Sequence, residues 1–240
     1  MILLTGEPNT GKSTAIMSLI DLLGRNRCGG FYTKEILENG QRVGFRTHTF
    51  SGKEFILAHV AFPKNYAVEE FGVDLDSFEK ICIDEILNCD KEYMIIDEIG
   101  SMQLYSERFK RLLLDLHKSK RKIIATICLV DTEFSAMYKN MNKDNLYTLD
   151  LNNRDQMPFI LAEVINSDDE VYLSKLALSS LYSRQQERFS YEGDKIILRS
   201  THGIRTITKE KDTYHCTCDY YKDHGTCSHI MAVVRNRYNK

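Results

Sequence analysis

The sequence predicts an α/β protein, in which a mainly parallel sheet lies between two layers of helices, followed by a small α+β module. Three observations support this prediction. Strand-like and helix-like segments alternate over residues 1–166, a rhythm typical of parallel sheets covered by helices on both faces. The glycine-rich stretch GEPNTGKS follows the first strand-like segment. Near the other end, His215–His229 reads HCTCDYYKDHGTCSH and concentrates three cysteines and three histidines.

The first 166 residues contain segments whose apolar spacing identifies them as strands or helices. Tyr93–Ile96 is a continuous apolar run, as expected for a strand buried on both faces. Leu104–Lys118 is amphipathic, as expected for a helix that packs on a sheet. In chain order, we predict strands at Ile2–Thr5, Gly30–Ile36, Val43–His48, Tyr93–Ile96, Lys122–Leu129 and Leu146–Leu151, and helices at Lys12–Leu23, Ser77–Leu87, Leu104–Lys118 and Gln156–Ile165.

The pattern changes after residue 166. The stretch NSDDE at 166–170 breaks the alternation, and its acidic residues suit the start of a connecting helix over Val171–Arg188. From Phe189 onward, the sequence has the pattern of short strands, with alternating apolar and polar residues, separated by turns. We therefore predict three parts: a domain of residues 1–166, a connecting helix within 167–188, and a module of residues 189–240.

Composition limits the class of protein. The 240 residues are 42% hydrophobic and 28% charged, which fits a globular chain with one good-sized core and an appendage. A net charge of −2 provides no global field that would attract nucleic acid or an anionic membrane. No apolar run approaches the roughly 20 residues of a membrane span, and the glycine-rich loop begins too early to leave room for a signal peptide. We therefore expect a cytoplasmic protein without a membrane partner.

The stretch Gly6–Ser13 matches the phosphate-loop pattern G-x-x-x-x-G-K-S/T, with a strand before it and a helix after it. Backbone N–H groups of residues 9–13, aided by the positive helix end, are predicted to surround the β-phosphate of a nucleoside triphosphate. Lys12 is predicted to reach the β- and γ-phosphates, and Ser13 to ligate Mg²⁺. The predicted nucleotide contacts are Gly6, Glu7, Pro8, Asn9, Thr10, Gly11, Lys12, Ser13 and Thr14.

An acidic pair follows another predicted buried strand, in YMIIDEIG. Asp97 is predicted to hold Mg²⁺ through water, and Glu98 to orient or deprotonate an attacking water molecule. The alternative for Glu98 alone is a structural acid at a strand end. The predicted strand pair contains further polar residues, Arg42 and Thr33–Glu35. These residues either border the nucleotide or belong to a solvated hairpin, and both alternatives stay open.

Residues 1–166 resemble the small P-loop nucleoside-triphosphatases first recognised in thermophiles, a family with a human cancer-related relative. The matching stretches are GEPNTGKST, GGFYTKEI, GQRVGFR, FGVDLDSFE, IIDEIGSMQL, ATI and NNRD. The resemblance implies a P-loop three-layer α/β/α sandwich and Mg²⁺-dependent hydrolysis of several nucleoside triphosphates to diphosphates. It also implies that Lys12 and Glu98 are catalytic, that Ser13 and Asp97 hold the metal, and that Arg154 lies near the nucleotide. The chain departs from the family at Asn9-Thr10, where glycine is usual, but asparagine tolerates left-handed backbone.

The C-terminal cluster has the spacing of a metal site. Cys216 and Cys218 are two residues apart and share one face of a predicted strand. Cys227 and His229 follow a turn at Gly225 and precede the helix-like run IMAVV. Three thiolates and one imidazole form a closed tetrahedral set, typical of structural Zn²⁺. The histidines at 215 and 224 are not predicted as ligands, because the first points to the opposite strand face and the second lies in the loop.

Residues 189–240 resemble the SWIM zinc finger, with its pattern C-x-C, a variable gap, and C-x-H. The resemblance implies a binding module rather than a catalytic one, and its partner is nucleic acid or protein. The module carries nine Lys and Arg against six Asp and Glu, a mild basic excess. Its tyrosines stack on bases or form the small core, and both alternatives stay open. They are Tyr214, Tyr220, Tyr221 and Tyr238.

These inferences combine into one functional prediction, a Mg²⁺-dependent nucleoside-triphosphatase with a zinc-stabilised recognition module. Two alternatives remain. The first is a zinc-finger binding protein switched by nucleotide with negligible turnover, and the second is a P-loop nucleotide or nucleic-acid kinase. The family resemblance also implies that residues 1–166 suffice for basal hydrolysis.

Overall fold

The computed structural model describes residues 1–130 and 132–238. Contacts between Cα atoms divide the chain into two compact units. The first unit comprises Met1–Lys12 and Cys28–Asp150, and the second comprises Ser13–Arg27 and Leu151–Lys240. This division by contacts differs from the predicted division along the chain, because a helix from the N-terminal part joins the C-terminal residues. Positions 239–240 of the predicted module lie outside the described residues.

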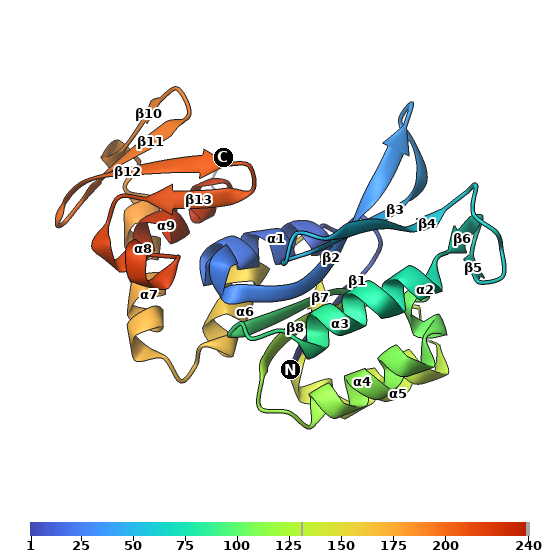
Figure 1. Ribbon diagram of the computed structural model, residues 1–240. Coiled ribbons are helices and arrows are strands. Elements are labelled where there is room, and N and C mark those ends of the chain that lie inside the picture. The colour runs from blue at the N-terminus through green and yellow to red at the C-terminus, as the bar shows by residue number, and fades with distance from the viewer. Residues whose placement is uncertain (131, 239–240) are drawn as a thin grey trace. The chain divides into compact units, whose positions relative to one another are not determined.

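The first unit is built on a nine-stranded sheet with the order β5-β6-β4-β3-β2-β7-β8-β1-β9 (Figure 1). Strands β2, β7, β8, β1 and β9 pair in parallel, whereas the remaining pairings of the sheet are antiparallel. The strands are β1 (Ile2–Gly6), β2 (Cys28–Glu38), β3 (Gln41–Thr49), β4 (Glu54–His59), β5 (Ala67–Val68), β6 (Phe71–Val73), β7 (Tyr93–Ile99), β8 (Lys122–Ile127) and β9 (Leu146–Leu149). The predicted mainly parallel sheet is confirmed.

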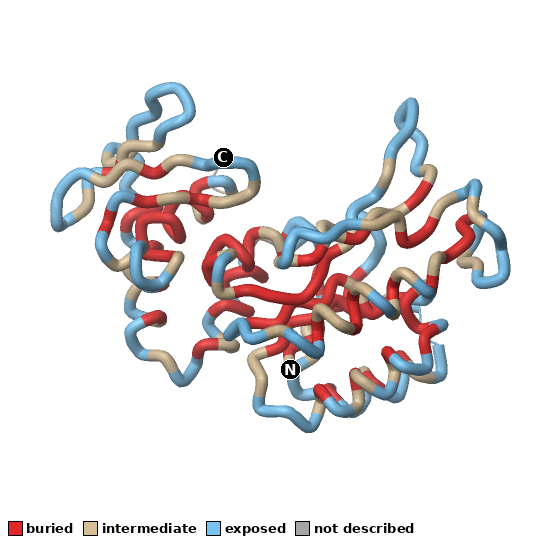
Figure 2. Tube along the Cα trace, in the orientation of Figure 1, coloured by how far each residue is buried: buried red, intermediate tan, exposed pale blue. Residues whose placement is uncertain are grey.

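The core of the first unit lies between the parallel strands and four helices. These are α2 (Leu75–Phe78), α3 (Asp84–Leu87), α4 (Glu107–His117) and α5 (Glu133–Met141). Phe78 of α2 meets Phe31 of β2 and Phe109 of α4 edge-to-face, with ring centroids 5.7 Å and 5.1 Å apart. Edge-to-face pairs add about 0.5–1.5 kcal/mol beyond their buried area. Figure 2 shows that the buried residues concentrate in the central strands, as their continuous apolar runs predict.

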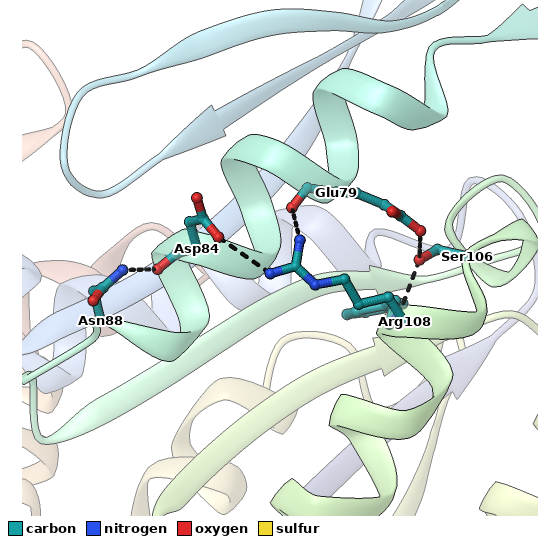
Figure 3. A network of polar contacts seen from close by, with 6 residues as sticks. Glu79, Asp84, Asn88, Ser106 and Arg108 are labelled. Carbon is teal, nitrogen blue, oxygen red and sulfur yellow. Dashed lines mark hydrogen bonds and ion pairs between the residues drawn. The ribbon is translucent and has the colours of Figure 1, made fainter.

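The segment predicted as one helix at Ser77–Leu87 contains a π-helical stretch, Glu79–Ile83, between α2 and α3. Polar contacts join this stretch to the start of α4 (Figure 3). Ser106, the N-cap of α4, accepts a hydrogen bond from the Phe109 N–H and donates one to the Glu79 carboxylate. Arg108 donates to the Glu79 carbonyl at 3.4 Å and pairs with Asp84 at 3.5 Å. The two helical segments are therefore fixed to one another on the core.

Some elements of the first unit were not predicted from the sequence. Strand β4 and helix α5 are the largest of these. Strand β4 pairs antiparallel with β3 and extends the predicted hairpin of β2 and β3. That hairpin turns at Asn39-Gly40, where both residues have positive φ angles of 52° and 79°. Such angles are typical of two-residue hairpin turns, in which Asn-Gly is favoured.

The second unit combines helices with a four-stranded antiparallel sheet in the order β10-β11-β12-β13. Its elements are α1 (Lys12–Leu23), α6 (Met157–Ile165), α7 (Glu170–Arg184), β10 (Phe189–Glu192), β11 (Lys195–Ser200), β12 (Gly203–Glu210), β13 (Thr213–Cys216), α8 (Asp219–His224) and α9 (Ser228–Asn236). The predicted connecting helix is α7, which begins behind the N-cap Asp169 and packs against α9. Within the described residues, no helix has the length and apolar character needed to cross a membrane.

Candidate nucleotide site and zinc centre

The phosphate loop connects the end of β1 to the start of α1. A Cβ atom at Gly6 would lie 2.5 Å from the carbonyl oxygen of Leu149 on β9, so only glycine fits there. Asn9 adopts a left-handed φ of 63°, as predicted for the position where the family usually has glycine. The Thr10 hydroxyl donates to the Glu7 carbonyl at 2.8 Å and closes the loop. The loop conformation therefore forms with this sequence.

The Lys12 ammonium lies within the loop. Its Nζ donates to the carbonyl oxygens of Gly6 and Glu7 at 2.8 Å and 3.0 Å. Ser13 and Thr14 follow it in the first turn of α1 and are exposed, as are Glu7 and Pro8. The charge of Lys12 is thus held at the loop, which is the position that the predicted phosphate contact requires.

Asp97 lies on β7, whose neighbour β8 also pairs with β1. Because the carboxyl ends of parallel strands meet at one edge of a sheet, Asp97 and the phosphate loop share that edge. Asp97 is buried, and the hydroxyl of Thr126 on β8 donates to its Oδ1 at 2.5 Å. A buried carboxylate oriented by a hydrogen bond suits a group that holds a cation. Nothing in the sequence singled out Thr126, because only the parallel register of β7 and β8 brings it to Asp97.

Glu98 is partly buried beside Asp97. Burial, and after it the charge of Asp97, raise the pKa of Glu98 to about 7 against the opposing charge of Lys12. A carboxyl group with a pKa near neutrality can both accept and release a proton at physiological pH. Two adjacent carboxyl groups also repel one another, and a divalent cation would relieve this repulsion. The residues present therefore fit a Mg²⁺ ion.

Gly100 is a second residue that sequence reasoning missed. A Cβ atom at this position would lie 2.7 Å from Oε1 and 2.9 Å from Cγ of Glu98. Because Gly100 has no side chain, it leaves free the space that the Glu98 side chain occupies. The signal available in the sequence was the glycine in DEIG directly after the acidic pair.

The remaining predicted nucleotide residues lie in exposed positions. Arg154 follows β9 and faces Asp155, with Nε and Oδ1 3.7 Å apart. Arg42 pairs with Glu35 at 2.9 Å across the hairpin, and both side chains are more than 40% exposed. An exposed ion pair of this kind fits the alternative in which these residues belong to a solvated hairpin. Contact of Arg154 with a nucleotide stays a prediction.

The predicted zinc ligands are brought together at one point of the second unit. The ligand atoms of Cys216, Cys218, Cys227 and His229 all lie within 4.8 Å of one another, and all four residues are buried. Cys216 ends β13, and the two other cysteines are the N-caps of α8 and α9. Cys216 Sγ lies 3.8 Å from His229 Nδ1. Tetrahedral zinc, with a Zn–S bond of about 2.3 Å and a Zn–N bond of about 2.0 Å, separates a sulfur from a nitrogen ligand by about 3.5 Å, close to this distance.

The charge states of the three thiols also fit a metal ion. Hydrogen bonds from Cys216 and Cys227 lower the pKa of Cys218. Burial raises the pKa of Cys227, and its hydrogen bonds to the other two thiols raise it further. Three neighbouring thiols cannot all ionise without a cation, whereas bound zinc stabilises all three thiolates. The donor set therefore fits Zn²⁺.

The other two histidines of the cluster are engaged elsewhere. His215 Nδ1 is hydrogen-bonded to the Tyr221 hydroxyl at 3.0 Å. The His224 ring stacks on Tyr220, with centroids 3.9 Å apart. Neither histidine belongs to the buried group of four ligand atoms. Tyr214 is buried and belongs to the small core, whereas Tyr220 is half-buried, and for Tyr220 both alternatives stay open.

Helix α1 is held by residues of the C-terminal module. The Thr226 hydroxyl, in the zinc loop, donates to the carbonyl of Leu22 at 2.9 Å. The hydroxyls of Ser18 and Tyr238 lie 2.6 Å apart. Arg237 pairs with Asp21 at 3.0 Å. These contacts join residues more than 200 positions apart, and no sequence pattern indicated them.

Comparison with known proteins supports both parts of the chain. Residues 1–162 match the model of the NTPase_1 family, described as NTPase, and residues 206–238 match the model of the SWIM zinc finger. The nucleoside-triphosphatase THEP1 of Thermotoga sp. (strain RQ2) is 37% identical over 158 residues, which cover 65% of this chain and 90% of that protein. THEP1 of Methanocaldococcus jannaschii is 31% identical over 170 residues, covering 69% and 95%.

Two solved structures share the fold over about two thirds of the chain or slightly more. The crystal structure of THEP1 from Aquifex aeolicus superposes with a TM-score of 0.60 and 30% identity, over 68% of this chain and 98% of that one. The solution structure of a human cancer-related nucleoside triphosphatase gives 0.55 and 26%, over 71% and 97%. Both resemblances drawn from the motifs are thereby confirmed. The chain belongs to the NTPase family that includes the THEP1 nucleoside-triphosphatases, and it carries a SWIM zinc finger at its C-terminal end.

Proposed function

We propose that this protein hydrolyses nucleoside triphosphates to diphosphates and phosphate with Mg²⁺, and that its SWIM module binds a nucleic-acid or protein partner. The observation that carries the proposal is the placement of Lys12, Asp97 and Glu98 at one edge of the parallel sheet, where the charges of Lys12 and Asp97 both act on Glu98. Family membership supports the same reaction. The chain covers 90% of the Thermotoga relative, so the catalytic part is compared over nearly its whole length.

In this mechanism the residues of the chain bind the triphosphate and prepare the water. The loop N–H groups and Lys12 hold the β- and γ-phosphates and offset their charge. Glu98 orients a water molecule and accepts its proton as the oxygen bonds to the γ-phosphorus. The bond from that phosphorus to the β–γ bridging oxygen breaks, and the nucleoside diphosphate leaves. When bound, Mg²⁺ would neutralise phosphate charge, and Ser13 and Asp97 would hold it.

We assign each part of the chain a separate role. Residues 1–166 catalyse the reaction, residues 167–188 form the connecting helix, and residues 189–240 form the zinc-stabilised binding module. A cytoplasmic location is part of the proposal. None of the seven cysteines forms a disulfide, and a thiolate zinc centre suits a reducing compartment. Arg154 is proposed to contact the base or a phosphate.

Steady-state phosphate release, measured with four nucleoside triphosphates in the presence and absence of Mg²⁺, tests the proposed reaction. Multiple turnovers that require Mg²⁺ support hydrolysis. Tight nucleotide binding with fewer than one turnover per hour would instead favour a nucleotide switch. Transfer of the labelled γ-phosphoryl group to a nucleotide or oligonucleotide acceptor would favour a kinase. Adding DNA, RNA or lysate to the same assay tests whether a partner of the SWIM module changes the rate.

A further inference from the structure

A polar cavity of about 190 Å³ lies in the second unit, between the start of α6, the last turns of α7 and the end of α9. Two arginines, Arg184 and Arg235, line it together with the hydroxyl side chains of Ser180, Ser183 and Tyr238. The cavity contains no residue of the phosphate loop, of the acidic pair or of the zinc ligands. The proposed hydrolysis gives it no role.

Arg235 is fixed in place by its neighbours. Its guanidinium carbon lies 3.8 Å from the centre of the Phe159 ring, and its Nε donates to the Ser179 hydroxyl at 3.1 Å. Stacking on an aromatic ring sets the plane of the guanidinium group, and the Nε bond sets its rotation within that plane. The rigid fork therefore loses little side-chain entropy when a ligand binds to its terminal nitrogens.

The two arginines repel one another across the cavity. Burial lowers the pKa of Arg235, the charge of Arg184 lowers it further, and the charge of Glu163 opposes this decrease. Within residues 1–130 and 132–238, neither arginine forms an ion pair. Asp155 is the acidic residue of the lining, and its carboxylate faces Arg154. The cavity thus holds two positive charges whose repulsion a doubly charged anion would relieve.

Geometry and volume limit the class of ligand. Guanidinium forks match the oxygen pairs of phosphate through two parallel hydrogen bonds. A cavity of about 190 Å³ is smaller than the roughly 300–1,000 Å³ of pockets that enclose whole small molecules. We propose that this cavity binds a phosphate monoester or free phosphate dianion through Arg184 and Arg235. The dianion could be inorganic phosphate, a nucleotide terminus or the 5′-phosphate of a nucleic-acid strand.

The test uses the full chain with Lys12→Ala, so that the phosphate loop does not contribute to binding. Calorimetric titration with inorganic phosphate at low salt should show one saturable site. Arg184→Gln should weaken its affinity at least tenfold, because Arg184 is exposed and its loss leaves the packing intact. Arg199→Gln, an exposed arginine on β11, is the matched control and should leave the affinity unchanged. Arg235→Lys keeps the charge but loses the fork, and should also weaken binding.

Three further ligands identify the source of the dianion. A nucleoside monophosphate, a 5′-phosphorylated oligonucleotide and the same oligonucleotide with a 5′-hydroxyl are titrated as competitors of inorganic phosphate. Competition that needs the 5′-phosphate and is weakened by Arg184→Gln assigns the cavity to strand ends, and competition by the monophosphate alone assigns it to nucleotides. The absence of a saturable phosphate site in the Lys12→Ala chain would overturn the proposal. So would equal affinities in Arg184→Gln and Arg199→Gln.

Discussion

Arg237, near the end of the described chain, forms an ion pair with Asp21 in the last turn of α1, with an N–O distance of 3.0 Å. The Asp21 side chain is 7% exposed and that of Arg237 is 33% exposed. The Nε of Arg237 also donates to the Tyr214 hydroxyl at 3.0 Å. Helix α1, which begins at Lys12, is therefore held by charge and hydrogen bonds from the module that contains the four candidate zinc ligands.

Arg237→Gln should destabilise the folded protein by about 2 kcal/mol. Breaking a fully buried pair costs about 3–5 kcal/mol because a charge is left uncompensated, and the partial exposure of Arg237 reduces this figure. Asp21→Asn is the matched control, since it leaves the exposed partner charged and should cost less. Urea unfolding of both variants and of the double variant measures the coupling between the two residues. Equal losses from the two single variants would contradict this account of the pair.

The cost of Arg237→Gln should also depend on pH. Burial raises the pKa of Asp21, and the Arg237 charge opposes that rise. Removing Arg237 raises the pKa of Asp21 further. A raised folded-state pKa means that stability is lost as pH rises through it. The difference in Tm between the native protein and the variant should therefore be largest at pH 7 and should become smaller toward pH 5.

A chain truncated after residue 166 should be less stable than the full chain. Family resemblance predicts that its folded molecules still hydrolyse nucleotide, because the NTPase family model matches residues 1–162. Truncation nevertheless removes Thr226, Arg237 and Tyr238, which contact α1. Thermal unfolding should show a lower Tm, while phosphate release per folded molecule at low temperature stays close to that of the full chain. A Tm equal to that of the full chain would show that these contacts contribute nothing.

Glu98→Gln should keep nucleotide binding and lose hydrolysis by about 10²–10⁴-fold, the usual contribution of a positioned general base. Glutamine retains the shape of the side chain but cannot accept the proton of the attacking water. Glu38→Gln, at the exposed end of β2, is the control and should leave the rate unchanged. Steady-state phosphate release and equilibrium binding of a non-hydrolysable triphosphate separate the two effects. Hydrolysis at the native rate would mean that another group orients the water.

Gly100→Ala should reduce hydrolysis while leaving the fold stable. The added Cβ would lie 2.7 Å from the Glu98 carboxylate, which can move away because it is the end of a flexible side chain. Such a displacement changes the position of the proposed base, and misplacement by about 1 Å can cost about 10²-fold in rate. We expect kcat to fall, with nucleotide affinity and Tm nearly unchanged. A loss of Tm without a loss of kcat would assign Gly100 to packing instead.

The zinc centre should contain one metal ion per chain. His229→Ala and Cys218→Ser should each abolish zinc, whereas His224→Ala should retain it, because its ring is stacked on Tyr220 outside the ligand group. Metal analysis of the purified variants measures this. Loss of zinc should also lower Tm, since a small module relies on its metal for stability. Zinc retained in Cys218→Ser would refute this ligand set.

Much of the site follows from residues close together in the chain. The loop from Gly6 to Ser13 and the strand that ends in Asp97-Glu98 are local patterns, and their chemistry requires those residue types at that spacing. The zinc ligands are equally local, because Cys216 and His229 are only thirteen positions apart. Short-range spacing carries this information, so the sequence predicts the parallel sheet, the phosphate loop and the metal centre.

Other features depend on packing between distant segments and have no local signature. Thr126 reaches Asp97 only through the register of β7 and β8. The contacts of Asp21 with Arg237, and the cavity shared by Arg184 and Arg235, arise because α7 and α9 pack together in the unit that contains α1. Periodicity shows which face of a helix is apolar but not which helix covers it. For that reason, only the folded structure shows that α1 belongs to the second unit, and the amino-acid pattern does not predict it.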